Sequence, residues 1–281
     1  MVLGEAPGAV ITWSAHLSML YAASPDRDRP ALARAAGFRT VDSWWLEDEA
    51  DTDPWMAAVE SERLNVALLN CPAGDVRAGA RGRLNIPEAE AEVLTDIDRS
   101  IAVAARVGAR SMNLLTGIEV SGCSRADQLR QAAGIVGEAT RRAAASGIRM
   151  LLEPLNTVDV PGYLICDVPG AIEVIELSGE AVGVLYDVYH TARAGRDPIA
   201  EIASYASLIG HVHYADHPGR GGPGTGSLDL SAIVDALLAA GYDGSIGLEF
   251  DPAGFPLAEL HDRLPLSEGV ARAGTEPLAG H

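Results

Sequence analysis

Four short apolar segments in the carboxyl half of the chain each end in an acidic residue or a histidine: Arg149-Met-Leu-Leu-Glu153, Val182-Gly-Val-Leu-Tyr-Asp187, Leu208-Ile-Gly-His-Val-His213 and Ser245-Ile-Gly-Leu-Glu249. A short apolar run of this kind predicts a strand that is buried on both faces. Longer amphipathic segments separate the four runs, and such segments are typical of the helices that connect parallel strands. The stretch from residue 149 to residue 249 therefore predicts an α/β fold.

The same alternation continues through the amino-terminal half. Further strands are expected at Val10–Trp13, Thr40–Trp44, Asn65–Asn70 and Arg110–Leu114. Helices are expected at Arg29–Ala36, Asp53–Glu62, Glu88–Val107, Arg125–Ser146, Val168–Leu177, Pro198–Ser204 and Leu230–Ala240, with a weaker one from about Pro256. Eight strand–helix units predict a (β/α)8 TIM barrel. A doubly wound sheet is the alternative, but the first strand is not followed by a dinucleotide-binding glycine motif, which favours the barrel.

The predicted helix ends carry suitable capping residues. Gly108, Gly147 and Gly241 each stand between a helical pattern and the next strand, where a left-handed cap is expected. Asp229 precedes the last long helix as a candidate N-cap. No linker or change of composition divides the chain. We therefore expect residues 1–281 to form a single domain with a core at about 10–264 and a loose carboxyl-terminal tail.

The charge of the chain excludes several classes of function. The net charge is −18, which argues against binding to nucleic acid or to an anionic membrane. All 21 basic side chains are arginine, because the sequence contains no lysine. Schiff-base chemistry, a lysine general base and a phosphate-binding lysine of the Walker type are therefore excluded.

Cysteine usage and the amino terminus indicate a cytoplasmic location. Cys71, Cys123 and Cys166 are odd in number and far apart, which fits a reducing compartment better than a disulfide framework. We find neither the pattern of a signal peptide nor an apolar segment long enough to span a bilayer.

The polar residues at the ends of the four runs predict a metal site. In a parallel barrel the carboxyl ends of the strands meet at one mouth, where active sites are built. Glu153, Asp187, His213 and Glu249 would then come together as three carboxylates and one imidazole. This ligand set suits one divalent cation, Mn²⁺, Mg²⁺ or Co²⁺, with Zn²⁺ as an alternative.

Two other histidines lie close to these ligands in sequence. His190 follows Asp187 by three residues and would either hydrogen-bond a substrate oxygen as a neutral imidazole or be structural. His211 lies two residues before His213 and shares its face of the strand. We expect the deeper His211 to be a core group or to support the ligands, and His213 to be the ligand.

Two more residues are candidates for binding substrate. Arg220 is the only cation of the loop from His217 to Gly226 and could pair with a substrate carboxylate. Trp44 ends the second predicted strand, where it would either form a wall of the substrate pocket or pack in the core. The long segment from Cys71 to Gly82 is a candidate lid.

The chain resembles the hydroxypyruvate isomerase family, within the xylose isomerase-like barrels of sugar isomerases and epimerases. The matching motifs lie between about residues 12 and 252 and are Leu17-Ser-Met-Leu20, Pro72-Ala-Gly-Asp75, Glu153-Pro-Leu-Asn156, Pro161-Gly-Tyr163, Asp187-Val-Tyr-His190, Ile209-Gly-His-Val-His213, Pro218-Gly-Arg220, Pro223-Gly-Thr-Gly226 and Gly241-Tyr-Asp-Gly-Ser-Ile-Gly-Leu-Glu249.

The resemblance implies that the four strand-end residues bind one divalent metal ion and that Glu153 and Glu249 exchange protons with the substrate. It also places Asn156 among the expected substrate-binding residues. Some positions depart from the family pattern. His213 stands where these isomerases usually carry glutamine, and His16, Ser43-Trp44-Trp45 and Ser227 also differ. These departures concern the choice of substrate more than the chemistry.

The expected function is a metal-dependent isomerase that interconverts hydroxypyruvate and tartronate semialdehyde, or a related small 2-oxo or hydroxy acid, through an enediolate. The alternatives are a ketose 3-epimerase or other sugar isomerase, and a dehydratase or lyase acting on a polyol or natural product at the same site. An endonuclease at abasic DNA and a non-catalytic metal-binding protein are further alternatives that the sequence favours less. The expected partner is a small-molecule substrate, and the chain itself could form a homodimer or homotetramer.

Overall fold

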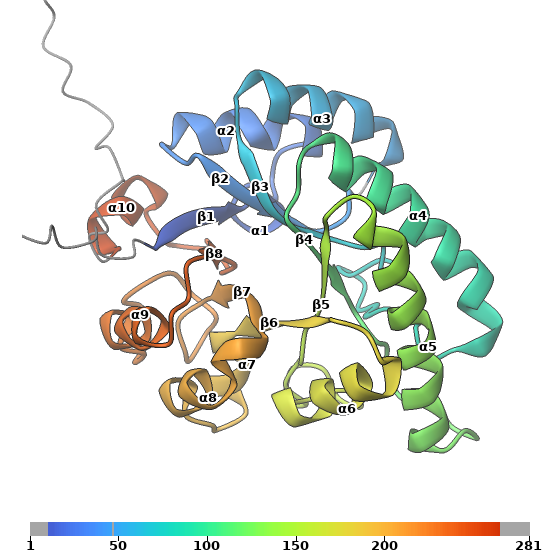
Figure 1. The fold of residues 1–281 in the computed structure, drawn as a ribbon. Coiled ribbons are helices and arrows are strands. Elements are labelled where there is room, and N and C mark those ends of the chain that lie inside the picture. The colour runs from blue at the N-terminus through green and yellow to red at the C-terminus, as the bar shows by residue number, and fades with distance from the viewer. Residues whose placement is uncertain (1–10, 47, 265–281) are drawn as a thin grey trace, which may run out of the picture.

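A computed structural model describes residues 11–46 and 48–264 of the chain, and its central element is a closed barrel of eight parallel strands (Figure 1). The strands are β1 (Thr12–His16), β2 (Thr40–Ser43), β3 (Asn65–Asn70), β4 (Ser111–Leu114), β5 (Arg149–Leu152), β6 (Gly183–Asp187), β7 (Ile209–Tyr214) and β8 (Ser245–Leu248). Neighbours in the barrel are neighbours in sequence, and β8 pairs with β1 to close it. The prediction of a (β/α)8 barrel is confirmed.

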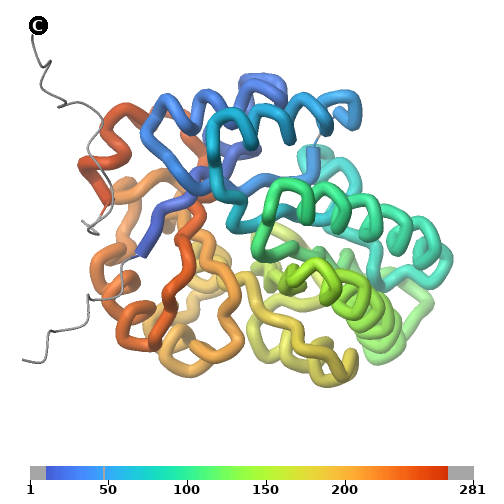
Figure 2. Tube along the Cα trace, turned by 45° about the horizontal axis from the view of Figure 1, so that its top comes forward, coloured from blue at the N-terminus to red at the C-terminus, as the bar shows by residue number. Residues whose placement is uncertain are grey.

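Helices surround the barrel on its outside, as the tube view in Figure 2 shows. They are α1 (Leu17–Leu20), α2 (Arg29–Ala35), α3 (Thr52–Ser61), α4 (Glu90–Arg106), α5 (Arg125–Ala144), α6 (Val168–Ser178), α7 (Val188–Arg193), α8 (Pro198–Tyr205), α9 (Leu230–Ala239) and α10 (Leu260–Arg263). Short 3₁₀ turns lie at Asp26–Asp28, Glu49–Asp51, Pro87–Ala89, Ala206–Leu208 and Leu257–Glu259. Within the part of the chain that is described, we find no helix that is long and apolar enough to cross a bilayer.

Most predicted elements occur within one or two residues of their expected bounds. The first strand is the exception, since it extends to His16, whereas Val10 lies outside the described residues. Two short helices, α1 and α7, were not predicted, because each is too short to show a helical period. The expected carboxyl-terminal tail also lies outside the described residues.

The predicted helix caps are present. Gly108, Gly147 and Gly241 have φ angles of 67°, 67° and 80°, in the left-handed region that glycine adopts without strain. The carboxylate of Asp229 accepts a hydrogen bond from the backbone N–H of Ala232 at the start of α9.

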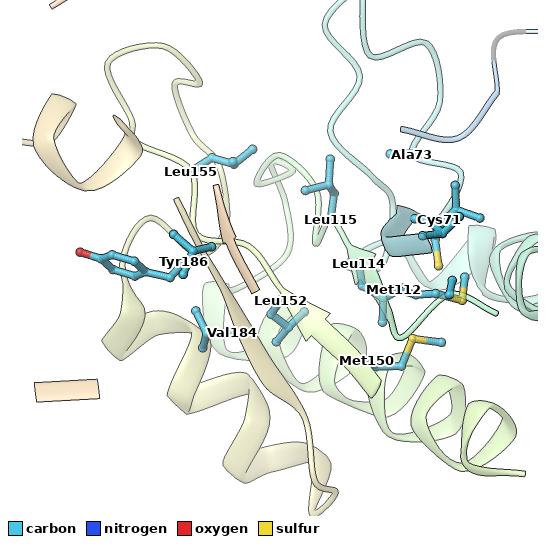
Figure 3. Close-up of a cluster of buried hydrophobic side chains, with 14 of the residues drawn as sticks. Cys71, Ala73, Met112, Leu114, Leu115, Met150, Leu152, Leu155, Val184 and Tyr186 are labelled. Carbon is cyan, nitrogen blue, oxygen red and sulfur yellow. The ribbon is translucent and has the colours of Figure 1, made fainter. Parts of the chain in front are cut away.

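The core consists of a large outer cluster and a small inner one. Outward-facing side chains of β4, β5 and β6 pack against the surrounding helices, as Figure 3 shows for Met112, Met150, Leu152 and Val184. Leu68, Leu151 and Leu185 form a separate cluster inside the barrel. Since successive strand residues face opposite sides of the sheet, the residues two positions beyond Leu151 and Leu185 also face inward. These residues are Glu153 and Asp187.

We expect the substitution Leu152→Ala to lower the free energy of unfolding by about 2–5 kcal/mol, since it removes a fully buried side chain and leaves a cavity. Leu177→Ala is the matched control, because Leu177 is 50% exposed on α6. The measurement is the urea concentration at half-unfolding. Equal midpoints for the two variants would contradict this account of the core.

Candidate metal centre

The four predicted ligands meet at the carboxyl end of the barrel. Glu153 directly follows β5, Asp187 ends β6, His213 lies near the end of β7, and Glu249 directly follows β8. All four side chains are buried, and one ligand atom from each lies within 4.8 Å of the others. The structure therefore brings together residues that are almost 100 positions apart in sequence.

The donor atoms of this cluster fit a divalent cation. The carboxylate atom Asp187 Oδ2 and the ring nitrogen Nδ1 of His213 are buried and have no hydrogen-bond partner among the described residues. Buried carboxylates repel one another when they are ionised, and a cation bound among them offsets this repulsion. Three carboxylates with one imidazole form a donor set that Mn²⁺, Mg²⁺, Co²⁺ and Zn²⁺ accept.

Glu249 is the most heavily contacted ligand of the cluster. Its Oε2 accepts a hydrogen bond of 2.6 Å from Arg220 Nη2, and its Oε1 accepts one of 2.9 Å from Trp44 Nε1. His16 Nε2 lies 3.5 Å from the same Oε1. Burial tends to raise the pKa of Glu249, but Arg220, His213 and His16 outweigh it and hold the pKa well below its usual range.

The pKa of Glu153 shifts in the opposite direction. Its Oε2 accepts a hydrogen bond of 2.7 Å from Asn113 Nδ2, and we find no ion pair to Glu153 in the described part of the chain. Burial, with repulsion from Glu249 as the second cause, raises its pKa to about 8. Burial also raises the pKa of Asp187, to about 6. At neutral pH the two glutamates therefore favour different protonation states, and such differences allow one site to hold an acid and a base.

His213 presents one ring nitrogen to the cluster. Its Nδ1 lies 3.5 Å from Glu249 Oε2. Burial would lower its pKa, but Glu249 and the other acids around it raise the pKa to about 9. A cation at this site would compete with that proton.

His190 is held as a neutral imidazole by Asn156. The backbone N–H and the side-chain Nδ2 of Asn156 lie 3.1 and 2.6 Å from His190 Nδ1, so this nitrogen accepts and Nε2 carries the proton. Nε2 lies 3.9 Å from Asp187 Oδ2, at the edge of the cluster. Burial lowers the pKa of His190 to about 3, consistent with the neutral form expected from sequence. The side chain of Asn156 thus contacts His190 and its own loop.

Arg220 lies against the cluster as well. Its backbone is left-handed, with a φ of 55°, and its carbonyl accepts a hydrogen bond from Asp251 N–H in the loop after β8. The guanidinium lies 5.3 Å from the ring centre of Tyr189. Besides its bond to Glu249, Nη2 lies 4.0 Å from Asp187 Oδ2. Arg220 therefore places a positive charge beside two of the predicted ligands.

Trp44 donates a hydrogen bond to Glu249 of the cluster and also lines a cavity of about 530 Å³. The loops after β2 and β3 line this cavity, and its walls include Trp44, Trp45, Asn70 and the first residues of the segment predicted as a lid. Arg77, from that segment, lies 5.6 Å from the ring centre of Trp44. The position of Trp44 is consistent with a wall of a substrate pocket.

Three polar residues of the mouth and the barrel interior were not predicted from sequence. Asn70 and Asn113 end or nearly end β3 and β4, so the rule that singled out the acids also applies to them. Asp42 lies inside the barrel, in the middle of β2, and contacts His211. A charged residue inside the predicted strand Thr40–Trp44 was the signal for it. His211 itself lies below the ligands, as expected.

Comparison with known proteins identifies the family. The family described as xylose isomerase-like TIM barrel matches residues 30–270. A putative hydroxypyruvate isomerase of Streptomyces coelicolor is 37% identical over 272 residues, which cover 92% of this chain and 98% of that protein. The chain belongs to the hydroxypyruvate isomerase family of xylose isomerase-like barrels. Its family makes it an isomerase.

Two further matches widen the range of relatives. A 2-oxo-tetronate isomerase of Cupriavidus necator is 31% identical over 241 residues, covering 85% of this chain and 92% of that protein. Among solved structures, one named AP endonuclease, family 2, from Brucella melitensis superposes with a TM-score of 0.82 at 29% identity. It covers 88% of this chain and 96% of its own. The family is thus shared by proteins with different names.

The raised pKa of Glu153 predicts how the stability of the protein, stripped of metal by a chelator, depends on pH. A group that binds its proton more tightly when folded stabilises the fold at low pH, and this contribution is lost as pH rises through the folded pKa. For Glu153 the loss runs from its ordinary value of 4.5 to about 8, and the raised pKa values of Asp187 and His213 act in the same direction.

We therefore expect the melting temperature of the stripped protein to fall between about pH 6.5 and pH 8, above the range in which the lowered pKa values of His16 and His190 act in the opposite direction, and Glu153→Gln to reduce this fall because it removes the ionisable group. Differential scanning fluorimetry measures the melting temperature at each pH. Glu259→Gln, at an exposed glutamate, is the control and should keep the wild-type slope. An unchanged slope in Glu153→Gln would contradict the protonation state assigned to this residue.

Proposed function

We propose that the enzyme interconverts hydroxypyruvate and tartronate semialdehyde, or isomerises a related small acid such as a 2-oxo-tetronate. The observation that carries the proposal is the pairing of two glutamates, Glu153 and Glu249, within one buried ligand cluster but with opposite pKa shifts. An isomerisation that moves a proton between adjacent carbons needs one group to remove it and one to supply it. The names of the relatives from S. coelicolor and C. necator support the substrate class.

In this proposal Glu153, Asp187, His213 and Glu249 would hold one divalent cation. Mn²⁺, Mg²⁺ and Co²⁺ suit the oxygen-rich donor set, with Zn²⁺ as the alternative. When bound, such an ion supplies Lewis-acid stabilisation of the negative charge that develops on the substrate oxygens.

The two glutamates would move the proton. Since Glu249 is ionised and Glu153 carries a proton at neutral pH, Glu249 is assigned as the first base, which takes a proton from the carbon that bears the hydroxyl group, and Glu153 as the group that delivers one to the neighbouring carbon. In the reverse direction the two exchange roles, since the same path is followed backwards. Arg220 and Trp44 hold the carboxylate of Glu249 from two sides, so its position is fixed before substrate arrives.

Other residues would orient the substrate. His190 offers the proton of Nε2 to a substrate hydroxyl, and Asn156 keeps that proton on Nε2 by donating to Nδ1. Arg220 would bind the substrate carboxylate with the donors that do not contact Glu249. Trp44 would form the wall next to the substrate, in front of the neighbouring cavity.

The main alternative uses the same residues on a different substrate. A ketose 3-epimerase also needs two groups that exchange a proton with the substrate, in this case at a single carbon atom. A dehydratase or lyase could use the same cluster. Endonuclease action at abasic DNA is the function in the name of the B. melitensis structure. The net charge of −18 opposes that function, because binding to DNA depends on neutralising its phosphates.

We also propose a cytoplasmic location and a homodimer or homotetramer.

The test is to incubate protein loaded with Mn²⁺ with hydroxypyruvate in deuterated water. After the reaction the metal is removed, and product and deuterium uptake are measured by NMR. We expect tartronate semialdehyde and deuterium at the exchanging carbon. Glu249→Gln should slow exchange by at least about 100-fold, since it removes one proton-transfer group. Glu259→Gln controls for loss of an exposed glutamate and should leave the rate unchanged.

Absence of both conversion and exchange would contradict the proposed substrate. Conversion of keto-sugars in place of hydroxypyruvate would favour the epimerase alternative. Wild-type exchange in Glu249→Gln would remove that residue from the proton transfer.

A further inference from the structure

A carboxylate lies inside the barrel below the predicted ligands. Asp42, in the middle of β2, is fully buried and belongs to the inward-facing layer of the barrel. Its Oδ2 lies 3.2 Å from His211 Nε2 and 3.8 Å from His213 Nε2. Its Oδ1 has no hydrogen-bond partner among the described residues. The side chain thus extends from β2 across the barrel to the histidines of β7.

The space for this carboxylate comes from a glycine on β8. A Cβ atom at Gly247 would lie 2.0 Å from Asp42 Oδ2 and 2.7 Å from His213 Cδ2. Any other residue at position 247 would therefore displace Asp42 or His213. Gly247 pairs with His213 in the barrel, so the strand beside the histidine leaves open the path by which Asp42 reaches it.

The two ring nitrogens of His213 face different groups. Nδ1 lies 3.5 Å from Glu249 Oε2, on the side of the four-ligand cluster, whereas Nε2 faces Asp42. A histidine that binds a metal ion through one nitrogen carries a proton on the other, and a carboxylate that accepts this proton fixes the ring and raises its basicity.

We propose that Asp42 is a positioning residue for His213: Nε2 has no hydrogen-bond partner among the described residues and lies 3.8 Å from Asp42 Oδ2, and with a cation on Nδ1 this carboxylate moves closer to Nε2, accepts its proton and fixes the ring. This inference rests on the proposed function, because it requires a cation held by the four ligands. The ring nitrogen Nε2 of His211 lies 3.2 Å from the same oxygen, so His211 fixes the position of the Asp42 carboxylate from below. Asp42 does not contact the substrate in this arrangement.

A second cation among Asp42, His211 and His213 is the competing explanation, since their ligand atoms also lie within 4.8 Å of one another. Two cations would have to share His213 through both ring nitrogens. The imidazole would then have lost both of its N–H protons, and a neutral imidazole is a very weak acid that rarely gives up its remaining proton. The geometry therefore favours one cation and a supporting carboxylate.

The first experiment compares Asp42→Asn with Asp51→Asn. Both substitutions replace a buried carboxylate with an amide of the same shape, but Asp51 pairs with Arg27, and we find no contact between Asp51 and the cluster among the described residues. Calorimetric titration of stripped protein with Mn²⁺ should give one ion per wild-type chain. We expect affinity to be about 10–100-fold weaker in Asp42→Asn and unchanged in Asp51→Asn.

Two further measurements separate positioning from a general structural defect. In Asp42→Asn, a large excess of Mn²⁺ should restore most of the rate of deuterium exchange, because the groups that transfer the proton remain. In the wild-type protein loaded with Zn²⁺, ¹⁵N NMR of the imidazole of His213 should show a proton on Nε2 and the metal on Nδ1. This last measurement needs no variant and still applies if Asp42→Asn does not fold.

The inference would be overturned by equal Mn²⁺ affinities of Asp42→Asn and Asp51→Asn, or by a metal-bound Nε2 in His213. Two ions per wild-type chain, reduced to one in Asp42→Asn, would establish the second cation instead. If the wild-type chain binds no divalent ion at all, the proposed function itself fails. Failure of the inference alone leaves wild-type binding and exchange intact.

Discussion

The repulsion between three carboxylates buried at one mouth is the constraint on which the rest of the site depends. Glu153, Asp187 and Glu249 lie too close together to be ionised without a compensating positive charge. Arg220 supplies part of it, and this contribution favours Glu249 over Glu153. The unequal pKa values of the two glutamates follow from this asymmetry, and a divalent cation would complete the neutralisation.

The barrel supports this cluster from two sides. At the mouth, Trp44, Asn113 and Arg220 each hold one carboxylate oxygen of the two glutamates. Below the mouth, Asp42 contacts His211 inside the barrel, and Gly247 makes room for the carboxylate of Asp42. Buried polar groups in a barrel core are costly unless they are paired. The pairing of Asp42 with His211 under His213 therefore indicates that the barrel interior supports this ligand.

Much of this arrangement could be predicted from sequence. The apolar runs that end in Glu153, Asp187, His213 and Glu249 predicted both the barrel and the convergence of the four residues, because parallel strands end at one mouth. Contacts of long side chains were not predictable. No pattern indicates that Arg220 bonds to Glu249 across 29 positions, or that Asn156 donates to His190. Asp42 was missed because a single acid in a strand has no partner until the fold brings β7 opposite it.

The central claim is that one divalent cation binds among the four strand-end residues. Anomalous diffraction from crystals soaked in Mn²⁺ tests it most directly, because the signal locates the ion without any assumption about the ligands. The account predicts one peak per chain, about 2.0–2.6 Å from a carboxylate oxygen of Glu153, Asp187 and Glu249 and from Nδ1 of His213. No peak there, or a peak only among Asp42, His211 and His213, would contradict it.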